Sequence, residues 1–378
     1  MTFNRLTLAL GLVALGLGQP AHADSCWVTS TDAYLGTQAN GKLGWMGLKA
    51  LVETYTSNRY LMSLSGDPIG NATVKFQVLF PGDTQPWDLA TVYSDSLGWA
   101  QVSISNLYGV DSSGKYYLKV SRGGATPVNH TLSTSQHIQV VTSVVGTPSG
   151  CDGAVVKDVY GSMYFRHPSD HSPVLFSDLD DTLFNTTDPR NVIRSMLTAH
   201  YQPIDDFAPD ATVEFRDAGG VYIGITAQFT ELRPLTRSEL LRWGFDEPYS
   251  DMEYYHDDPG YDGSYLGRTL SYIANDDYPT NGKITDYNRD HCALKVEKLG
   301  QFVDLIFHGS SDDVIGIIGD SEHSDGCSAA EYGIHWYALM EKGDEVSSEY
   351  PSTDYDEITE GWPQALPLVC ADGGLACN

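Results

Sequence analysis

The sequence predicts two folded parts, an all-β immunoglobulin-like sandwich followed by an α/β domain with a doubly wound parallel sheet. Up to about residue 150, short runs of alternating apolar and polar residues are separated by turn signals. Beyond about residue 172, short apolar runs alternate with helical patterns, which is typical of a parallel sheet covered on both faces. The chain has 378 residues, of which 41% are hydrophobic, and this suffices for two cores.

The first residues have the pattern of a secretory signal peptide. Arg5 supplies the positive charge, Leu6–Leu17 the short apolar run, and Ala21-His22-Ala23 a small-x-small cleavage site. The apolar run is short for a membrane span, and an uncleaved anchor is the alternative. We therefore expect residues 1–23 to be a signal peptide and the protein to be secreted or periplasmic. We expect no integral membrane segment after signal removal.

Six cysteines fit an oxidising compartment, where an even number suggests disulfide bonds. Six cysteines allow about 15 complete pairings, so the connectivity stays open. No CxxC pair has the spacing of a zinc site. The favoured pairing joins cysteines that bracket the β-rich part or lie close in the C-terminal tail, and then the remaining two: Cys26 with Cys151, Cys370 with Cys377, and Cys292 with Cys327.

The formal net charge of −28 limits the classes of partner. So acidic a surface disfavours nucleic acid and anionic membranes, because both are polyanions. It also repels phosphorylated substrates, so a phosphate site in this chain needs its own cations. A solvated acidic surface explains the charge most simply, and calcium binding is the alternative.

The β-sandwich is predicted for residues 24–151. Val74, Phe76, Val78 and Phe80 alternate with polar residues, and the same period of two recurs in 100–104 and 116–120. Turn signals such as Pro81-Gly82-Asp83 separate the runs. The stretch 90–105, ATVYSDSLGWAQVSIS, resembles the immunoglobulin-like modules of bacterial secreted proteins.

The α/β domain is predicted for residues 152–345, with an elaborated insertion or small cap at about 246–290 and an acidic tail at 346–378. Asp188-Pro189 is a good start for a helix. Thr236 and Glu239 predict a capping box for a helix that ends near Trp243. A further helix is expected around 293–299. The expected strands are 174–177, 221–225 and, as the last one, 314–318.

The chemistry begins with Asp178-Leu179-Asp180-Asp181-Thr182 at the end of an apolar strand. Ligands of doubly wound sheets bind beyond the carboxyl ends of the strands. A carboxylate there, Asp178, can attack phosphorus, and Asp180 can protonate the leaving oxygen and later deprotonate water. Thr182 would fix the loop and lie near the phosphate. The alternative is a calcium-binding loop.

Three further pieces follow in order. Thr226 comes after the strand 221–225 and could bind a phosphate oxygen. Lys295 begins a helix and could neutralise the phosphate and Asp178. Asp320 and Asp325 follow the strand 314–318 in the segment GDSEHSD and could hold Mg²⁺, which takes few carboxylates together with water and phosphate oxygens.

In these motifs, residues 172–345 resemble the haloacid dehalogenase superfamily. The resemblance implies a nucleophile at Asp178, an acid/base at Asp180 and phosphate binding by Thr226 and Lys295. It also implies Mg²⁺ ligation by Asp178, Asp320 and the backbone carbonyl of Asp180, with support from Asp325. An acid at position 180 is typical of the phosphatase branch of this superfamily.

A second resemblance is to lipin-type and related phosphatidate phosphatases. It is carried by Thr226-Ala227 and by the segments RPLTRSELLRWG (233–244), LKVEKL (294–299) and GDSE (319–322). We therefore expect an exported, Mg²⁺-dependent phosphomonoester hydrolase whose substrate is a phosphorylated small molecule or lipid, such as phosphatidate. The alternative is a surface binding or adhesion protein with a degenerate phosphatase-like domain.

Overall fold

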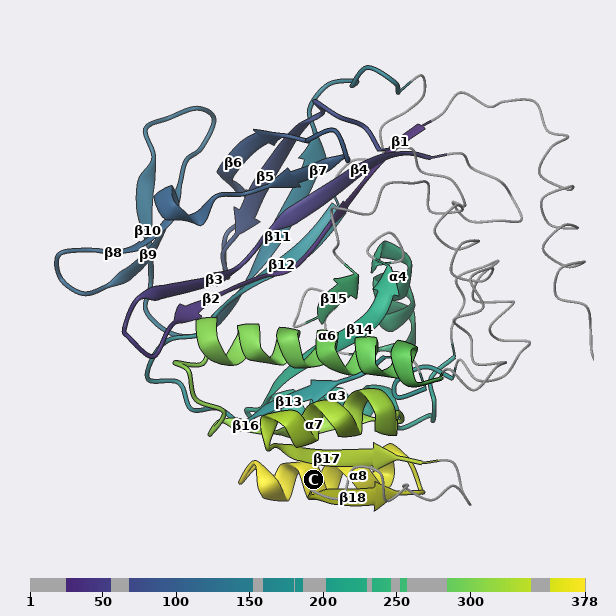
Figure 1. Ribbon diagram of the computed structural model, residues 1–378. Helices are drawn as coiled ribbons and strands as arrows, with labels where there is room; N and C mark the ends of the chain where they lie inside the picture. Colours follow the sequence, from purple (N-terminus) through teal and green to yellow (C-terminus); the bar gives the residue numbers. More distant parts are fainter. Residues whose placement is uncertain are drawn as a thin grey trace, which may run out of the picture.

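The computed structural model describes residues 25–55, 68–151, 159–179, 181–185, 202–229, 233–245, 252–256, 284–340 and 354–377. These residues form a mixed α/β structure with several β-sheets (Figure 1). The N-terminal part is rich in β-strands that are mostly antiparallel, and the C-terminal part is built on one parallel sheet. The predicted change of architecture along the chain is therefore confirmed in outline.

Three sheets make up the β-rich part. Their strand orders are β1-β4-β7, β10-β9-β8 and β3-β2-β12-β11-β5-β6. The bounds of these strands are β1 (Ser25–Ser30), β2 (Ala33–Thr37), β3 (Leu43–Met46), β4 (Lys49–Tyr55), β5 (Thr73–Leu79), β6 (Trp87–Tyr93), β7 (Trp99–Gln101), β8 (Tyr108–Val110), β9 (Tyr116–Val120), β10 (Val128–Leu132), β11 (Gln136–Val144) and β12 (Val159–Phe165).

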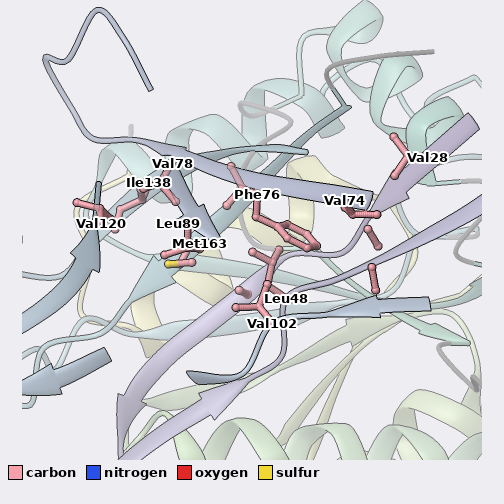
Figure 2. Packing of buried hydrophobic residues seen from close by; sticks show 14 of the residues in the cluster. Val28, Leu48, Val74, Phe76, Val78, Leu89, Val102, Val120, Ile138 and Met163 are labelled. Atoms are coloured by element: carbon pink, nitrogen blue, oxygen red, sulfur yellow. The ribbon is translucent and has the colours of Figure 1, made fainter. Parts of the chain in front are cut away.

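One apolar core lies between these sheets (Figure 2). On β5, Val74, Phe76 and Val78 are fully buried, while the residues between them are partly exposed. The alternation predicted for this strand is therefore confirmed. In the run 100–104 burial alternates as predicted, but the strand is shorter, because β7 ends at Gln101 and a short 3₁₀ turn, η1 (Ile104–Asn106), follows.

The β-rich part extends beyond the predicted boundary at residue 151. Strand β12 lies between β11 and β2 in the six-stranded sheet. Met163 and Phe165 point into the core between the sheets, whereas Tyr164 packs against the C-terminal part. Since both faces of β12 are covered, its sequence lacks the period of two that identifies a strand with one wet face.

The parallel sheet has the strand order β15-β14-β13-β16-β17-β18. Successive strands are added outward on both sides of β13, so the winding direction reverses between β13 and β16. The bounds of these strands are β13 (Val174–Ser177), β14 (Val221–Phe229), β15 (Met252–His256), β16 (Val314–Gly319), β17 (His335–Leu339) and β18 (Tyr355–Ile358).

Helices cover both faces of this sheet. On one face α3 (Ala208–Asp217), α4 (Arg233–Trp243) and α8 (Trp362–Asp372) enclose one apolar core. On the other face α6 (Ile284–Leu305) and α7 (Cys327–Tyr332) enclose a second core, and the turn η3 (Glu322–Gly326) leads into α7. The layered arrangement matches the alternation of strands and helices expected from the sequence.

Several predicted bounds need correction. The strand expected to end at Ile225 continues to Phe229 as β14. Helix α4 ends at Trp243 as predicted, but it begins at Arg233, so Thr236 lies inside it and does not cap it. The insertion predicted at 246–290 contains β15, which joins the sheet edge, and the start of α6. The rest of that insertion and the helix predicted from Asp188 lie outside the described residues.

Residues 354–377 of the segment predicted as an acidic tail belong to the folded structure. Val314–Ile318 is not the last strand, because β17 and β18 follow it in the same sheet. Helix α8 buries Trp362, Ala365, Leu366 and Val369 at the spacing of one helix face. This apolar face holds the C-terminal segment against the sheet.

All three disulfides have the favoured pairing. Cys26–Cys151 closes the β-rich part, Cys370–Cys377 lies at the end of α8, and Cys292–Cys327 links α6 to α7. Disulfides are typical of proteins outside the cytoplasm. Among the described helices, none is long and apolar enough to cross a membrane. Residues 1–23, predicted as a signal peptide, lie outside the described part of the chain.

Helix α6 lies between the β-rich part and the parallel sheet (Figure 1). The ring of Tyr34 on β2 meets that of Phe302 on α6 edge to face, with centroids 4.6 Å apart. The paired residues Gly36 and Gly44 allow a close approach, since a Cβ on Gly44 would lie 1.7 Å from the carbonyl oxygen of Leu305.

A buried ion pair adds to this junction. The guanidinium Nη2 of Arg237 on α4 lies 3.3 Å from Oδ1 of Asp32, which also accepts a hydrogen bond from the backbone N–H of Ser162. Asp32 is almost fully buried. The two parts therefore share both apolar and charged contacts, so their relative position is set by packing.

Candidate active site

Two predicted site residues follow neighbouring strands at the point where the sheet reverses its winding. Asp178 comes directly after β13, and Asp320 comes directly after β16. The two strands are parallel neighbours, and the N–H of Asp178 donates a hydrogen bond to the carbonyl of Ile318. Diverging connections leave a crevice at such a point, which is where open α/β sheets bind ligands.

Three carboxylates converge there. Asp178, Asp320 and Asp325 each offer an oxygen, and these oxygens all lie within 4.8 Å of one another. Asp325 reaches the group from η3 and is fully buried, with Oδ2 accepting a hydrogen bond from the N–H of Ser321 at 3.1 Å. Gly319 makes room for it, because a Cβ at this position would lie 2.2 Å from that same oxygen.

Lys295 lies among these carboxylates. Its side chain comes from α6 and is almost fully buried, with Nζ at 3.2 Å from Oδ2 of Asp178. Nζ also donates a hydrogen bond to Oδ1 of Asp325. Burial lowers the pKa of Lys295, but the carboxylates of Asp178 and Asp325 more than offset this effect and raise it overall. The ammonium is therefore charged at neutral pH.

One lysine does not balance three carboxylates. Burial, together with the charges of Asp178, Asp325 and Asp181, raises the pKa of Asp320 from 3.8 to about 9, and Lys295 lowers it only in part. An additional positive charge would therefore stabilise the ionised form of these three carboxylates. Carboxylate oxygens are hard ligands, and a set made of them suits Mg²⁺ or Ca²⁺ rather than a thiolate- or imidazole-seeking metal.

The loop after β13 is held by its backbone. The N–H of Leu179 donates to Oδ1 of Asp178, and Asp181 adopts a left-handed conformation with φ of 54°. Thr182 is fully buried, and its carbonyl accepts a hydrogen bond from the indole of Trp362 on α8 at 2.9 Å. The backbone of Thr182 thus links this loop to α8, and a role of its side chain near the phosphate stays a prediction, while Asp180 lies outside the described residues.

Thr226 lies at the same edge of the sheet. Ser177 pairs with Gly224, so Thr226 is level with the residues just beyond the end of β13. Its side chain is fully buried, and the register of β14 with β15 shifts after this residue. The structure therefore brings Asp178, Lys295, Asp320 and Asp325 into contact distance and places Thr226 beside their edge.

Two contributors were absent from the sequence prediction. The backbone N–H of Ser321 donates a hydrogen bond to the carboxylate of Asp325. The position of Ser321 between Asp320 and Asp325 in the sequence could have indicated this role. Trp362 anchors the loop through Thr182 from a segment that reads as a tail. No pattern links residues 180 positions apart, so this contact has no local signal.

Comparisons with known proteins add little to this geometry. No protein-family model matches the chain, and no curated protein matches it. Among solved structures, it is similar to an uncharacterized protein from Listeria monocytogenes serotype 4b. The identity is 14%, over 53% of this chain and 99% of that chain, with a TM-score of 0.24. So low a score does not indicate a shared fold.

Proposed function

We propose that this protein is a Mg²⁺-dependent phosphomonoester hydrolase of the haloacid dehalogenase superfamily, acting through an aspartyl-phosphate. The observation that carries the proposal is the buried Lys295 ammonium between Asp178 and Asp325, with Asp320 facing them. These residues come from three separate segments of the sequence. Their convergence at the carboxyl ends of two adjacent strands supports the roles that the resemblance implies.

In the first step, a carboxylate oxygen of Asp178 attacks phosphorus, and the bond between phosphorus and the ester oxygen breaks. Asp180 gives its proton to the departing oxygen. In the second step, water attacks the phosphorus of the aspartyl-phosphate, and Asp180 takes a proton from that water. The bond between phosphorus and Asp178 then breaks, which releases inorganic phosphate and restores the carboxylate.

Lys295 has a defined part in this scheme. Its ammonium has three donors, and two of them serve Asp178 and Asp325. Among the described residues no acceptor is recorded for the third, which would therefore serve a phosphate oxygen and stabilise its growing charge. Thr226, at the same edge, is proposed as a second phosphate contact. Local cations of this kind are needed because the chain carries a net charge of −28.

Asp178, Asp320 and Asp325 are the residues that would hold the metal, together with the backbone carbonyl of Asp180. When bound, Mg²⁺ would supply positive charge to the phosphate oxygens and to the crowded carboxylates. A calcium loop fits the described residues less well, because Ca²⁺ takes six to eight oxygen ligands and Lys295 occupies part of this space.

We propose a phosphate monoester as the substrate class, with phospholipids such as phosphatidate favoured by the lipin-type resemblance. At β2 and β12, one face of the largest sheet packs toward α6 and the other lines the core of the β-rich part. The outward face of β5 is partly exposed, so an adhesion role would use that face, the loops or the sheet edges.

Phosphate release from a panel of phosphatidate, nucleotides, sugar phosphates, phosphopeptides and a chromogenic ester tests the proposal. Activity should require Mg²⁺, disappear in EDTA and vanish in Asp178→Asn. The exposed Asp304 on α6 offers a matched control, and Asp304→Asn should keep full activity. Turnover that persists in Asp178→Asn or without metal would exclude the mechanism, and no release from any ester would exclude the function.

A further inference from the structure

One disulfide brackets the proposed phosphate site. Cys292 precedes Lys295 by one helical turn on α6, and Cys327 follows Asp325 by two residues at the start of α7. Their Cα atoms are 5.8 Å apart. The covalent bond therefore joins the two elements that carry the ion pair between Lys295 and Asp325.

Lys295 lies in the middle of α6, which begins at Ile284. From Leu299 onward the buried face of α6 packs into the core beneath the sheet. Among the described side chains from 292 to 298, the buried ones are Cys292 and Lys295. Within this described stretch the helix is therefore held by a disulfide and by a buried charge, and the carboxylate partners of Lys295 offset the cost of burying that charge.

The other end of the disulfide, Cys327, directly follows a well-anchored turn, η3. The N–H of Asp325 donates to the carbonyl of Ser321, whose own N–H donates back to the Asp325 carboxylate. The hydroxyl of Ser328 donates to the carbonyl of Ser324. Gly326 lies so close to the ring of Trp336 that a Cβ would come within 2.8 Å of it. These contacts fix η3 independently of α6.

We propose that the Cys292–Cys327 disulfide is a positioning element that holds the Lys295 ammonium between Asp178 and Asp325. It ties the turn of α6 that carries Lys295 to the residue that directly follows η3. This inference rests on the proposed phosphatase function, and it makes turnover depend on an intact disulfide. The protein would then reach full activity only in an oxidising compartment, where this bond forms and persists.

The other two disulfides provide matched controls. Cys26–Cys151 closes a loop within the β-rich part, and Cys370–Cys377 closes a short loop after α8. Each pair is replaced by serine in the full-length protein, and all variants are compared at a temperature at which circular dichroism shows them folded. Loss of Cys292–Cys327 should lower kcat on a chromogenic phosphate ester at least about tenfold and leave KM nearly unchanged, because small displacements of a charged group act on the transition state. The control variants should keep wild-type kcat.

A second measurement does not depend on activity. Acetylation of lysines, mapped by mass spectrometry, should be slow at the buried Lys295 of the wild type. It should become at least about tenfold faster at Lys295 after removal of Cys292–Cys327, as expected when local opening exposes a buried amine. Lys75 in the β-rich part serves as the internal control, and its labelling should not change.

The outcomes separate the two proposals. Unchanged kcat and unchanged Lys295 labelling in the Cys292→Ser/Cys327→Ser variant would overturn the positioning role. Labelling that rises at Lys75 as much as at Lys295 would also overturn it, since the disulfide would then stabilise only the whole fold. A wild-type protein that hydrolyses no ester, combined with selective labelling of Lys295, would refute the phosphatase function and leave the positioning role standing.

Discussion

Asp320 is the group whose replacement most directly tests the electrostatics of the site. In the metal-free protein its pKa is raised from 3.8 to about 9 by burial and by the charges of Asp178, Asp325 and Asp181. The folded protein therefore keeps a proton on Asp320 at pH values at which the unfolded chain releases it. Replacing Asp320 by asparagine, which cannot ionise, should stabilise the metal-free fold while it removes the proposed activity.

The sign and size of the effect follow from proton linkage. Because the folded state binds one more proton than the unfolded state between pH 3.8 and about 9, the free energy of unfolding falls as the pH rises through this range. Each pKa unit corresponds to 1.36 kcal/mol. Between pH 3.8 and pH 7 the free energy of unfolding of the wild type should therefore fall by at most about 4 kcal/mol through this group, whereas that of Asp320→Asn should not fall for this reason. Near pH 4 the two proteins should have nearly equal stability, since the side chain is neutral in both.

Urea denaturation in EDTA at pH 4, 5.5 and 7 measures this difference. In a second series without EDTA, a free Mg²⁺ concentration of one hundred times its Kd should raise the free energy of unfolding of the wild type by about 2.7 kcal/mol. Asp320→Asn should gain less, because it has lost one carboxylate ligand. A variant that is no more stable than the wild type at pH 7 in EDTA, or whose advantage does not grow with pH, would refute the electrostatic reasoning.

Three further predictions concern buried groups. Lys295→Met should cost about 3 to 5 kcal/mol in urea denaturation, because it leaves buried carboxylates without their counter-charge. Gly44→Ala should cost about 1 to 3 kcal/mol, since the added Cβ would collide with the backbone of Leu305. Gly47→Ala is its control, because a Cβ there would meet only ordinary contacts. Burial lowers the pKa of His137 to about 4, so His137→Phe should protect the protein from a loss of up to about 3 kcal/mol as the pH falls from 6.5 to 4.

Each of these has a clear contrary result. Lys295→Met as stable as the wild type in EDTA would show that the carboxylates do not depend on this cation. Equal denaturation midpoints for Gly44→Ala and Gly47→Ala would show that α6 does not press on the β2–β3 hairpin. Parallel pH profiles of stability for His137→Phe and the wild type would show that this histidine is not buried in its neutral form.

The convergence of Asp178 and Asp320 was predictable because each position is encoded locally, whereas their roles stay predictions. Asp178 and Asp320 each follow an apolar strand directly, and adjacent parallel strands end at the same edge of a sheet. Finding each aspartate directly after a predicted strand was therefore enough to predict that the two lie at the same edge of the sheet. Lys295 was recognised by its order among the motifs, although its nearly complete burial depends on tertiary packing that a helical pattern does not show.

The elements that escaped prediction lack a local signal or carry a misleading one. Strand β12 is buried on both faces, and so is β2, so neither shows the alternation of a half-wet strand. Helix α8 does show an apolar stripe, but its acidic surroundings and Pro367 inside the helix suggested a tail. The stripe beginning at Trp362 was the better indicator, because burial of a helix face outweighs the cost of one proline.

Helix α6 connects these observations, because it contributes both to the site and to the junction. Lys295 lies in its middle, eleven residues after Ile284, so it does not begin the helix as the sequence suggested, while Phe302 and Leu305 near its end pack against β2 and β3. The β-rich part covers the face of α6 that points away from the parallel sheet, so it sets the position from which Lys295 reaches Asp178. On this reasoning the β-rich part acts first as a support for the site. Any binding role would be additional, because Tyr34, Met46 and Tyr164 of the β-rich part already pack into the core that α6 shares.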